Sequence, residues 1–234
     1  MKLSVIVPVY NEQNTVEKII KKIKTLKKIN KQIIIVDDGS SDNTKDILKR
    51  KLLKNVDKII FHKNNFGKGA AIRSGQKFIK GDVVIIQDAD LEYDPKDYYR
   101  LLKPFRNKRV KVVYGSRVLK KKKYKLTENF WVNFRVFANQ VLTMYSNILN
   151  SQNLTDAHTC YKVFRADLFR SIKLQENDFA FCPEVTTKIS NQKIEILEVP
   201  ISYTGRTYKE GKKINLIDGI KALAVIIKYK FYFN

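Results

Sequence analysis

The chain has 234 residues, which suits one domain, or one domain with an appendage, at the usual ~100–200 residues per domain. A hydrophobic content of 44% and an aromatic content of 11% allow a large buried core and exclude intrinsic disorder. The 46 Lys and Arg outnumber the 23 Asp and Glu, and this formal charge of +23 favours polyanionic partners such as nucleic acid, an anionic membrane surface or phosphorylated substrates. A lysine-rich proteome is the alternative source of the excess.

The first half of the chain alternates strand-like and helix-like segments. Continuous apolar runs, typical of strands buried on both faces, predict strands over residues 3–9, 32–36, 56–61, 82–86 and 110–114. Helical spacing and capping residues predict helices between them, beginning near residues 16, 41, 68 and 95. This order predicts an α/β fold with parallel pairing, right-handed crossovers and helices on both faces of the sheet.

The second half is less regular. A long helix is expected over residues 129–149, and two further strands over 161–164 and 194–199. Leu216, Ile220, Leu223 and Ile227 share one face of a tail, residues 214–233, which we expect to be an amphipathic helix. We expect one domain over residues 1–212, followed by this helix over 213–234, packed on the core or lying in a membrane interface.

The sequence predicts no metal-binding cysteines, no signal peptide, no membrane-spanning helix and no functional histidine. Cys160 and Cys182 lack metal-ligand spacing and predict reduced thiols in a cytosolic protein. The N-terminus runs straight into a strand, so we expect no signal peptide. No run of about 18 apolar residues occurs, so no helix is expected to span a membrane. His62 and His158 stand apart in the sequence and are expected to be structural.

Four polar clusters follow predicted strands, where ligands bind to parallel sheets. They are residues 8–12 (PVYNE), 37–41 (DDGSS), 65–69 (NFGKG) and 88–92 (DADLE). Carboxylates gathered at one edge repel one another, and a divalent cation such as Mg²⁺ or Mn²⁺ removes that repulsion. Alternation along an extended segment predicts that Asp88, Asp90 and Glu92 point to one side and share the ion.

Each cluster alone has a structural explanation. A single Asp-x-Asp is common in turns and helix caps, and Asp-Asp-Gly is typical of a tight turn. Gly67-Lys68-Gly69 lacks the full phosphate-loop pattern, and we expect it to allow a close backbone approach at a helix start. The placement of all four clusters at one sheet edge is what favours a functional site.

The clusters also resemble a known family. Pro8-x-Tyr10-Asn11-Glu12, Val36-Asp37-Asp38-Gly39-Ser40, Asp88-Ala89-Asp90-Leu91 and Gly115-Ser116-Arg117 match, in order, the signature of family 2 glycosyltransferases with the GT-A fold. Within that family, the chain looks most like the dolichyl- or polyprenyl-phosphate mannose and glucose synthases. The resemblance covers about residues 1–212 and implies a Rossmann-like, mostly parallel sheet. It also implies inverting transfer of a hexose from a GDP- or UDP-sugar with Mg²⁺ or Mn²⁺.

The resemblance implies a role for each matching residue. The nucleotide sugar would be held by Pro8, Tyr10, Glu12, Val36, Asp38, Asp88, Ala89 and Asp90. Asp88, Asp90 and Glu92 would hold the metal, and Asp90, Arg117 and Asp156 would be catalytic. Arg135, Arg206 and Lys212 would grip the phosphate of the acceptor. Cys160 departs from the pattern, because relatives usually have Gly in that region.

The nature of the acceptor determines the mechanism. A phosphate monoester has a second pKa of about 6 and is already nucleophilic near neutral pH, so it needs cations and no general base. A hydroxyl acceptor in polysaccharide or glycolipid synthesis needs a base, for which Asp156 and Glu184 are the candidates. We expect a polyprenyl-phosphate or glycan acceptor, and a cytoplasmic protein held peripherally on an anionic membrane surface.

Two other protein classes account for part of the sequence. A basic nucleic-acid-binding protein explains the charge, but no RNA- or DNA-binding motif is present, and no nucleic-acid partner is expected. A sugar nucleotidyltransferase is also α/β and metal-dependent, but it needs a glycine-rich basic loop directly after the first strand. This chain has Tyr10-Asn11-Glu12 there.

Overall fold

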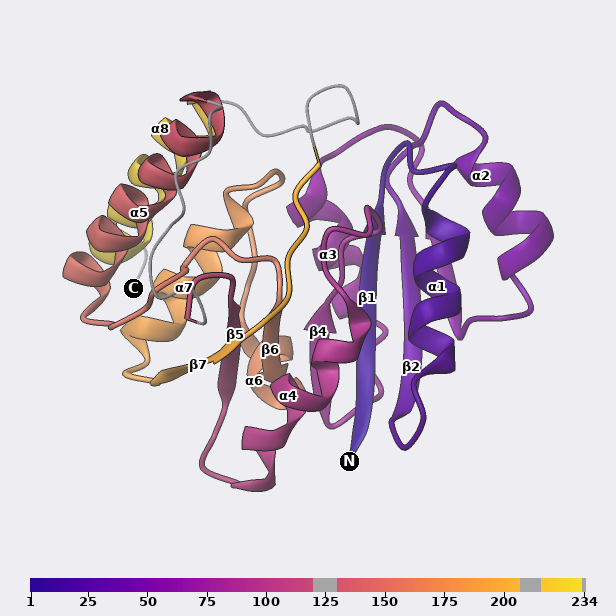
Figure 1. Ribbon diagram of the computed structural model, residues 1–234, viewed down its shortest axis with the longest axis horizontal. Helices are drawn as coiled ribbons and strands as arrows, with labels where there is room; N and C mark the ends of the chain where they lie inside the picture. The colour runs from indigo at the N-terminus through magenta and orange to yellow at the C-terminus, as the bar shows by residue number, and fades with distance from the viewer. Residues whose placement is uncertain (120–129, 207–215, 233–234) are drawn as a thin grey trace.

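The structure, a computed structural model, describes residues 1–119, 130–206 and 216–232 (Figure 1). Its strands are β1 (Lys2–Val9), β2 (Asn30–Asp37), β3 (Lys58–Phe61), β4 (Val83–Ile86), β5 (Val112–Ser116), β6 (Lys162–Arg165) and β7 (Ile196–Pro200). Its α-helices are α1 (Val16–Thr25), α2 (Thr44–Ile47), α3 (Lys68–Gln76), α4 (Tyr98–Leu102), α5 (Phe130–Asn150), α6 (Ala166–Ser171), α7 (Phe181–Asn191) and α8 (Leu216–Ile227). Shorter helical turns cover Leu48–Leu52, Pro95–Asp97, Lys103–Arg106 and Lys228–Tyr232.

The seven strands form one sheet in the order β3-β2-β1-β4-β6-β5-β7. β1, β2, β3 and β4 pair in parallel, as expected. The expectation that the parallel pairing continues directly to the strand at 110–114 is wrong, because β6 lies between β4 and β5 and is antiparallel to both. The direction of β6 depends on where the chain returns after α5, which is a long-range property. The sheet as a whole is mostly parallel, because β5 and β7 again run together.

Both faces of the sheet are covered, because both sets of alternating side chains in β1 are buried. Ile6 lies against Gly75 of α3, while Val5 and Val7, which point to the other face, are also fully buried. The expected layers of an α/β fold are therefore confirmed.

The tail forms a helix that packs beside α5 and α7 (Figure 1). Ala222, Val225, Ile226 and Tyr229 are buried, so one face of the tail contributes to the protein interior. Among the described residues, no helix combines the length and the apolar character needed to cross a membrane.

Candidate active site

In open α/β sheets the ligand crevice lies at the topological switch point, and the strand order predicts it at the carboxyl ends of β1 and β4. The chain leaves β1 toward β2 and β3 on one side and then returns to β4 on the other, which makes this point the topological switch of the sheet. Glu12 follows β1 and Asp88 follows β4, so the crevice lies between two of the predicted clusters. The prediction that the four clusters meet at one edge of the sheet is confirmed, since β1, β2, β3 and β4 are parallel.

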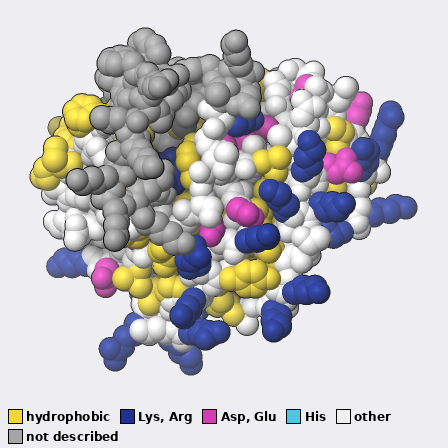
Figure 2. All heavy atoms as spheres, in the orientation of Figure 1, with side chains coloured by type: hydrophobic (Ala, Val, Ile, Leu, Met, Phe, Trp, Pro, Cys, Tyr) yellow, Lys and Arg dark blue, Asp and Glu magenta, His cyan; other side chains and the backbone are white. Residues whose placement is uncertain are grey.

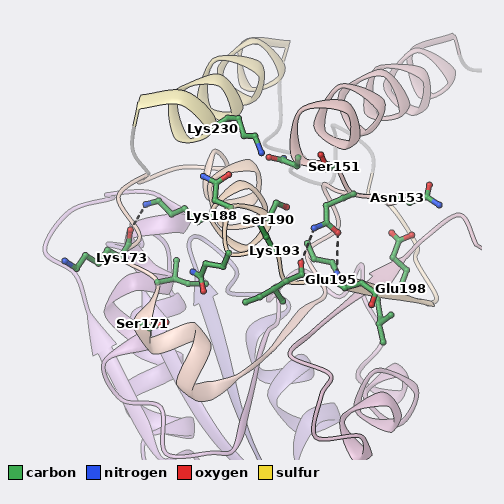
Figure 3. A pocket seen from close by; sticks show the side chains of 18 of the residues that line it. Ser151, Asn153, Ser171, Lys173, Lys188, Ser190, Lys193, Glu195, Glu198 and Lys230 are labelled. Carbon is green, nitrogen blue, oxygen red and sulfur yellow. Dashed lines mark hydrogen bonds between the residues drawn. The ribbon is translucent and has the colours of Figure 1, made fainter.

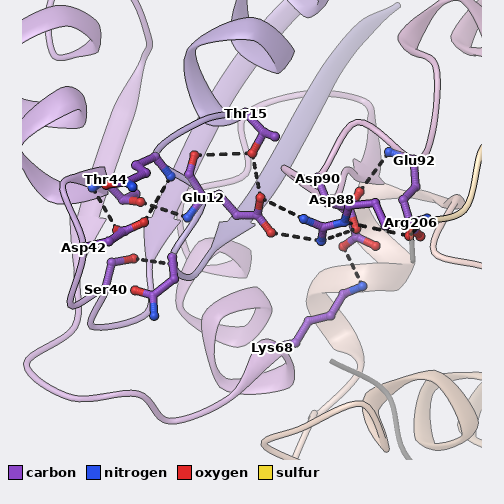
Figure 4. Close-up of polar contacts among 12 residues, drawn as sticks. Glu12, Thr15, Ser40, Asp42, Thr44, Lys68, Asp88, Asp90, Glu92 and Arg206 are labelled. Carbon is purple, nitrogen blue, oxygen red and sulfur yellow. Dashed lines mark hydrogen bonds and ion pairs between the residues drawn. The ribbon is translucent and has the colours of Figure 1, made fainter. Parts of the chain in front are cut away.

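The loop after β1 is fixed by the loop after β2 (Figure 4). The Asn11 amide donates to Ser40 Oγ at 3.0 Å, and the Glu12 amide donates to Thr44 Oγ1 at 2.9 Å. Thr15 Oγ1 donates to Glu12 Oε2 at 2.6 Å. These contacts hold the nearly buried Glu12 carboxylate so that it points toward the turn after β4.

The segment after β4 is a turn, so the expectation of an extended segment with alternating acids is wrong. Leu91 has φ = 66°, in the left-handed region, and the Glu92 amide donates to Asp90 Oδ1 at 3.1 Å. Burial, followed by the charges of Asp88 and Glu92, raises the pKa of Asp90 to about 7. The surrounding protein therefore disfavours the negative charge of Asp90 unless a nearby cation balances it.

Two basic side chains enter the acidic cluster, which comprises Glu12, Asp88, Asp90 and Glu92 (Figure 4). Lys68, at the start of α3, lies 2.6 Å from Asp88 Oδ1. Arg206 donates to both oxygens of Glu12, at 3.2 and 3.1 Å, and to Asp90 Oδ2 at 3.2 Å. Four carboxylates and two cations leave a formal charge of −2 among the described residues of the cluster.

Sequence reasoning missed the contact of Lys68, although the signal was present. Lys68 belongs to the third cluster, and all four clusters were expected at one edge. The expected close backbone approach is confirmed: a Cβ on Gly67 would lie 2.3 Å from Asn177 O, and one on Gly69 would lie 2.3 Å from Glu176 O. The two glycines let α3 start against the 176–177 backbone, which places Lys68 beside Asp88.

Glu92 anchors the segment that carries Arg206. Its carboxylate accepts from Tyr203 Oη at 2.8 Å and from the Arg206 amide at 2.7 Å, and its carbonyl accepts from the Thr204 amide at 3.0 Å. A β-bridge between Tyr93 and Tyr203 continues this connection. Glu92 thus brings Arg206 to the acids from a position more than a hundred residues along the chain.

The acidic cluster fits a divalent cation through its donors. Asp88 and Asp90 offer hard carboxylate oxygens, and the formal charge of −2 matches one such ion. The three predicted ligands do not converge, because Glu92 is turned toward Tyr203 and Arg206. Indeed, no three Asp, Glu, His or Cys side chains of the described chain are arranged to share a metal ion. One or two carboxylates together with substrate phosphates are nevertheless a common set for Mg²⁺.

The remaining residues predicted to hold the nucleotide lie at the same edge. Pro8 and Val36 are register partners on β1 and β2, and Asp38 is the first residue after the end of β2. Val36 is fully buried, so only its backbone can face a ligand, and Ala89 is also buried. Tyr10 and Pro8 are partly exposed. Their roles remain predictions.

Arg117, which is partly exposed, and the buried Asp156 form an ion pair beside the cluster. Arg117 Nε and Nη2 donate to the two Asp156 oxygens at 2.6 and 2.7 Å, and the guanidinium lies 5.1 Å from the centre of the Tyr203 ring. The neighbouring Arg117 keeps the pKa of Asp156 below its ordinary value, despite burial that acts to raise it. Asp156 is completely buried, so in this geometry it positions Arg117 and does not face an acceptor.

The lowered pKa of His158, which lies next to this pair, predicts that the folded protein is less stable in acid. Burial and then Lys162 lower its pKa from 6.5 to about 4, and its Nε2 has no hydrogen-bond partner among the described residues. The unfolded chain binds this proton more readily than the folded chain. The contribution of His158 to the free energy of unfolding is therefore fully present above pH 6.5 and is lost as the pH drops toward 4. At about 1.4 kcal/mol per pH unit, the loss reaches up to about 3 kcal/mol.

Replacing this side chain should reduce that part of the pH dependence. We expect His158→Gln to show a shallower decline in the free energy of unfolding between pH 6.5 and 4, measured by urea titration at each pH. Equal slopes for the variant and the parent protein would contradict a neutral His158 in the folded state.

The other predicted residues lie away from the crevice or outside the described structure. Glu184 is buried, accepts from the Gln175 and Glu176 amides at 2.7 and 2.9 Å, and pairs with Lys188. The Arg135 side chain and the whole of Lys212 lie outside the described residues. Both cysteines are free and buried.

A cavity of about 1340 Å³ lies at another part of the molecule (Figure 3). It is bordered by the ends of α5, α6 and α7, the start of β7, and lysines 173, 188, 193 and 230. None of the predicted site residues lines it. The chemistry expected from the sequence is therefore concentrated in the crevice between β1 and β4.

Comparison with known proteins agrees with this geometry. The model of the family described as "Glycosyl transferase family 2" matches residues 4–173. A "Dolichol-phosphate mannosyltransferase" of Pyrococcus furiosus is 28% identical over 215 residues, and the match spans 91% of this chain and 59% of that protein. A "UDP-N-acetylglucosamine--dolichyl-phosphate N-acetylglucosaminyltransferase" of Methanococcus voltae is 27% identical, with 96% and 94% covered.

The solved structures that resemble this chain have the same architecture. Glucosyl-3-phosphoglycerate synthase from Mycobacterium tuberculosis, in complex with Mg²⁺ and UDP, is similar with a TM-score of 0.70 at 16% identity. The match covers 97% of this chain and 79% of that one. The GT-A fold expected from the motifs is confirmed, and the chain belongs to glycosyl transferase family 2.

Proposed function

We propose that the protein is an inverting, metal-dependent glycosyltransferase that moves a hexose from a nucleoside-diphosphate sugar to a polyprenyl phosphate. The observation that carries this proposal is the acidic cluster at the switch point of the sheet, with Lys68 and Arg206 inserted among its carboxylates. The names of the Pyrococcus and Methanococcus relatives support a polyprenyl-phosphate acceptor, since both names specify the phosphate of dolichol. The neighbours crystallised with UDP and Mn²⁺ or Mg²⁺ support the donor class and the ion.

The donor would lie across the crevice with its base toward β2 and its diphosphate toward Asp88 and Asp90. When bound by these two carboxylates, a divalent ion would stabilise the negative charge of the departing nucleoside diphosphate. Glu12 and Asp38 would orient the nucleoside, and Arg117, held by Asp156, would lie on the side of the sugar. Orientation of this kind removes much of the entropic barrier to transfer.

A phosphate acceptor agrees with the burial of the two candidate bases. Asp156 is occupied by Arg117, and Glu184 is occupied by two backbone amides and Lys188, so neither faces the crevice. A phosphate dianion needs no base and instead needs cations to bring it to the anomeric carbon. Arg206 would serve this purpose once a bound divalent ion neutralises the acids around it. The predicted partners Arg135 and Lys212 would assist.

A thermal-shift screen with UDP, GDP and their sugars, with and without Mn²⁺, tests the donor site. A ligand that binds only the folded state raises the apparent melting temperature. We expect a shift that requires both a nucleotide and the ion. No shift with any nucleotide, together with tight binding of nucleic acid, would instead favour a basic binding protein.

The exposed faces of α5 and α8 support peripheral attachment to a membrane. Phe137, Val141, Met144 and Ile148 recur at helical spacing on α5, and Phe137, Met144 and Ile148 are 62%, 59% and 70% exposed. Ile220 of α8 is 68% exposed, and two aromatic side chains follow α8, Phe231 and Tyr232. Apolar side chains are visible at the upper left of Figure 2, the region of α5 and α8, while Lys and Arg side chains are scattered over the right and lower parts of this face. We place this apolar surface in the headgroup region of the cytoplasmic leaflet, with the nearby lysines toward anionic lipids.

Charges on this surface should prevent membrane binding. We expect the double variant Met144→Glu, Ile148→Glu to bind vesicles of phosphatidylglycerol and phosphatidylethanolamine at least about tenfold more weakly in a sedimentation assay, because two apolar side chains that would insert into the membrane are lost. Leu53→Glu is the control, since Leu53 is 56% exposed on another part of the surface. Equal binding by the double variant and this control would rule out the α5 surface as the attachment site.

A further inference from the structure

Asp38, at the carboxyl end of β2, is almost completely enclosed by hydrogen-bond donors of this chain. Its Oδ1 accepts from His62 Nδ1 at 2.6 Å and from the Phe66 amide at 3.0 Å. Its Oδ2 accepts from the Gly67 amide at 2.7 Å. The side chain is only 4% exposed. The protein therefore fixes the orientation and the hydrogen bonds of this carboxylate before a ligand binds.

The backbone around Asp38 is built for this arrangement. Gly67 has φ = 98°, which turns its amide toward Asp38, and a Cβ there would collide with the carbonyl of Asn177. Gly39 has φ = 71°, and a Cβ there would lie 2.4 Å from the carbonyl carbon of Asn64. The segment of residues 62–67 is thus packed directly against the end of β2.

His62 has a defined proton arrangement. A carboxylate only accepts hydrogen bonds, so Nδ1, at 2.6 Å from Asp38, carries a proton. The other ring nitrogen, Nε2, lies 2.8 Å from Ser74 Oγ on α3. Held at both nitrogens, the imidazole keeps one acceptor position of Asp38 occupied.

Counting acceptor positions leaves one for a ligand. A carboxylate has about four lone-pair positions, two on each oxygen. His62 and Phe66 fill both positions on Oδ1, and Gly67 fills one of those on Oδ2. Among the described residues no donor takes the second position on Oδ2, so a single position there is left for a ligand.

We propose that His62 and the amides of Phe66 and Gly67 restrict Asp38 to one ligand hydrogen bond, and that the donor is therefore a UDP-sugar and not a GDP-sugar. This proposal rests on the proposed function, in which Asp38 faces the base of the nucleotide. Uracil presents one N–H, at N3, between two carbonyl oxygens, and one open acceptor satisfies it. Guanine presents N1–H and an amino group side by side, and a carboxylate satisfies both only with two open oxygens.

The binding free energies of the two bases should differ because guanine keeps one N–H group without an acceptor. A guanine bound at one oxygen of Asp38 would leave a polar N–H without its charged partner in a nearly closed site. A hydrogen bond to a charged group contributes enough that its loss corresponds to about tenfold or more in affinity. His62 is thereby a specificity-determining residue that acts through Asp38.

Isothermal titration of UDP and GDP into the full chain with Mn²⁺ tests the proposal. We expect UDP to bind at least about tenfold more tightly than GDP. Equal affinities, or tighter binding of GDP, would overturn the proposal while leaving the transferase function intact. If neither nucleotide binds, the proposed function itself fails and the preference fails with it.

Two variants of His62 separate a specificity role from a structural one. His62→Ala frees a position on Oδ1, and we expect the ratio of UDP to GDP affinity to fall at least several-fold. His62→Asn places an amide N–H near the position of Nδ1 and should retain most of the ratio. If both folded variants keep the ratio of the parent protein, His62 does not determine specificity. If the alanine variant does not fold, the comparison of UDP with GDP in the unaltered protein still decides the question of the base.

Discussion

Asp90→Asn is expected to lower the rate of sugar transfer by roughly 10²–10³-fold, about 3–4 kcal/mol in transition-state free energy. Asp90 lies in the acidic cluster, where burial and the neighbouring carboxylates raise its pKa to about 7. An ion bound there would remove this repulsion and neutralise the diphosphate, and the neutral amide removes one of the two carboxylates expected to hold it. Steady-state transfer of radiolabelled sugar to a polyprenyl phosphate, at several Mn²⁺ concentrations, measures the loss.

A matched substitution in the same segment controls for local disturbance. Asp94 accepts a hydrogen bond from the Lys96 amide at 3.0 Å as a helix cap and, within the described part of the chain, makes no hydrogen bond or ion pair with the acidic cluster, so Asp94→Asn should keep nearly full activity. The asparagine variant of Asp90 should unfold at least as high in temperature as the parent protein, because a repelled carboxylate has been removed. Unchanged transfer by that variant would show that Asp90 does not hold the ion.

Arg206→Ala is expected to strengthen the binding of Mn²⁺ to the donor-free protein by about tenfold or more. Arg206 donates to Glu12 and Asp90 at 3.1–3.2 Å, so it neutralises acids that an ion would otherwise meet. Without it, the free energy of unfolding in metal-free buffer should fall by about 3 kcal/mol, because buried charges lose their partner. Added Mn²⁺ should restore most of this loss. Electron paramagnetic resonance of free Mn²⁺ and urea titration measure the two effects.

The same variant tests the role of Arg206 toward the acceptor. If Arg206 grips the acceptor phosphate, transfer should fall far more than hydrolysis of the donor, whereas an equal fall in both would assign it to the donor. Arg73→Ala is the control, because Arg73 donates to the carbonyls of Gln175 and Glu176 and contacts no acid of the cluster. An unchanged or weakened affinity for Mn²⁺ in the Arg206 variant would contradict the view that this arginine and the ion compensate the same acids.

Local sequence patterns are sufficient to predict the layers of the fold and the edge of the sheet that carries the site. Continuous apolar runs such as residues 32–36 can be satisfied only by a sheet covered on both faces, and parallel strands necessarily bring their carboxyl ends together. For this reason Glu12, Asp38, Asp88 and Asp90 could be assigned to one edge from local patterns alone. The ordered motifs also predicted the family.

How those side chains pair and where they point depends on contacts between distant parts of the chain. The left-handed turn at Leu91 breaks the expected alternation of the acids, and Lys68 and Arg206 reach the cluster from residues far away in the chain. Local patterns give no signal for the antiparallel β6, for the enclosure of Asp38 by His62, or for the burial of Asp156 against Arg117. A hydrophobic period reports only which face of a segment is buried. Charge pairing depends on distances between segments that meet only after the chain has folded, and so it has no local signature in the sequence.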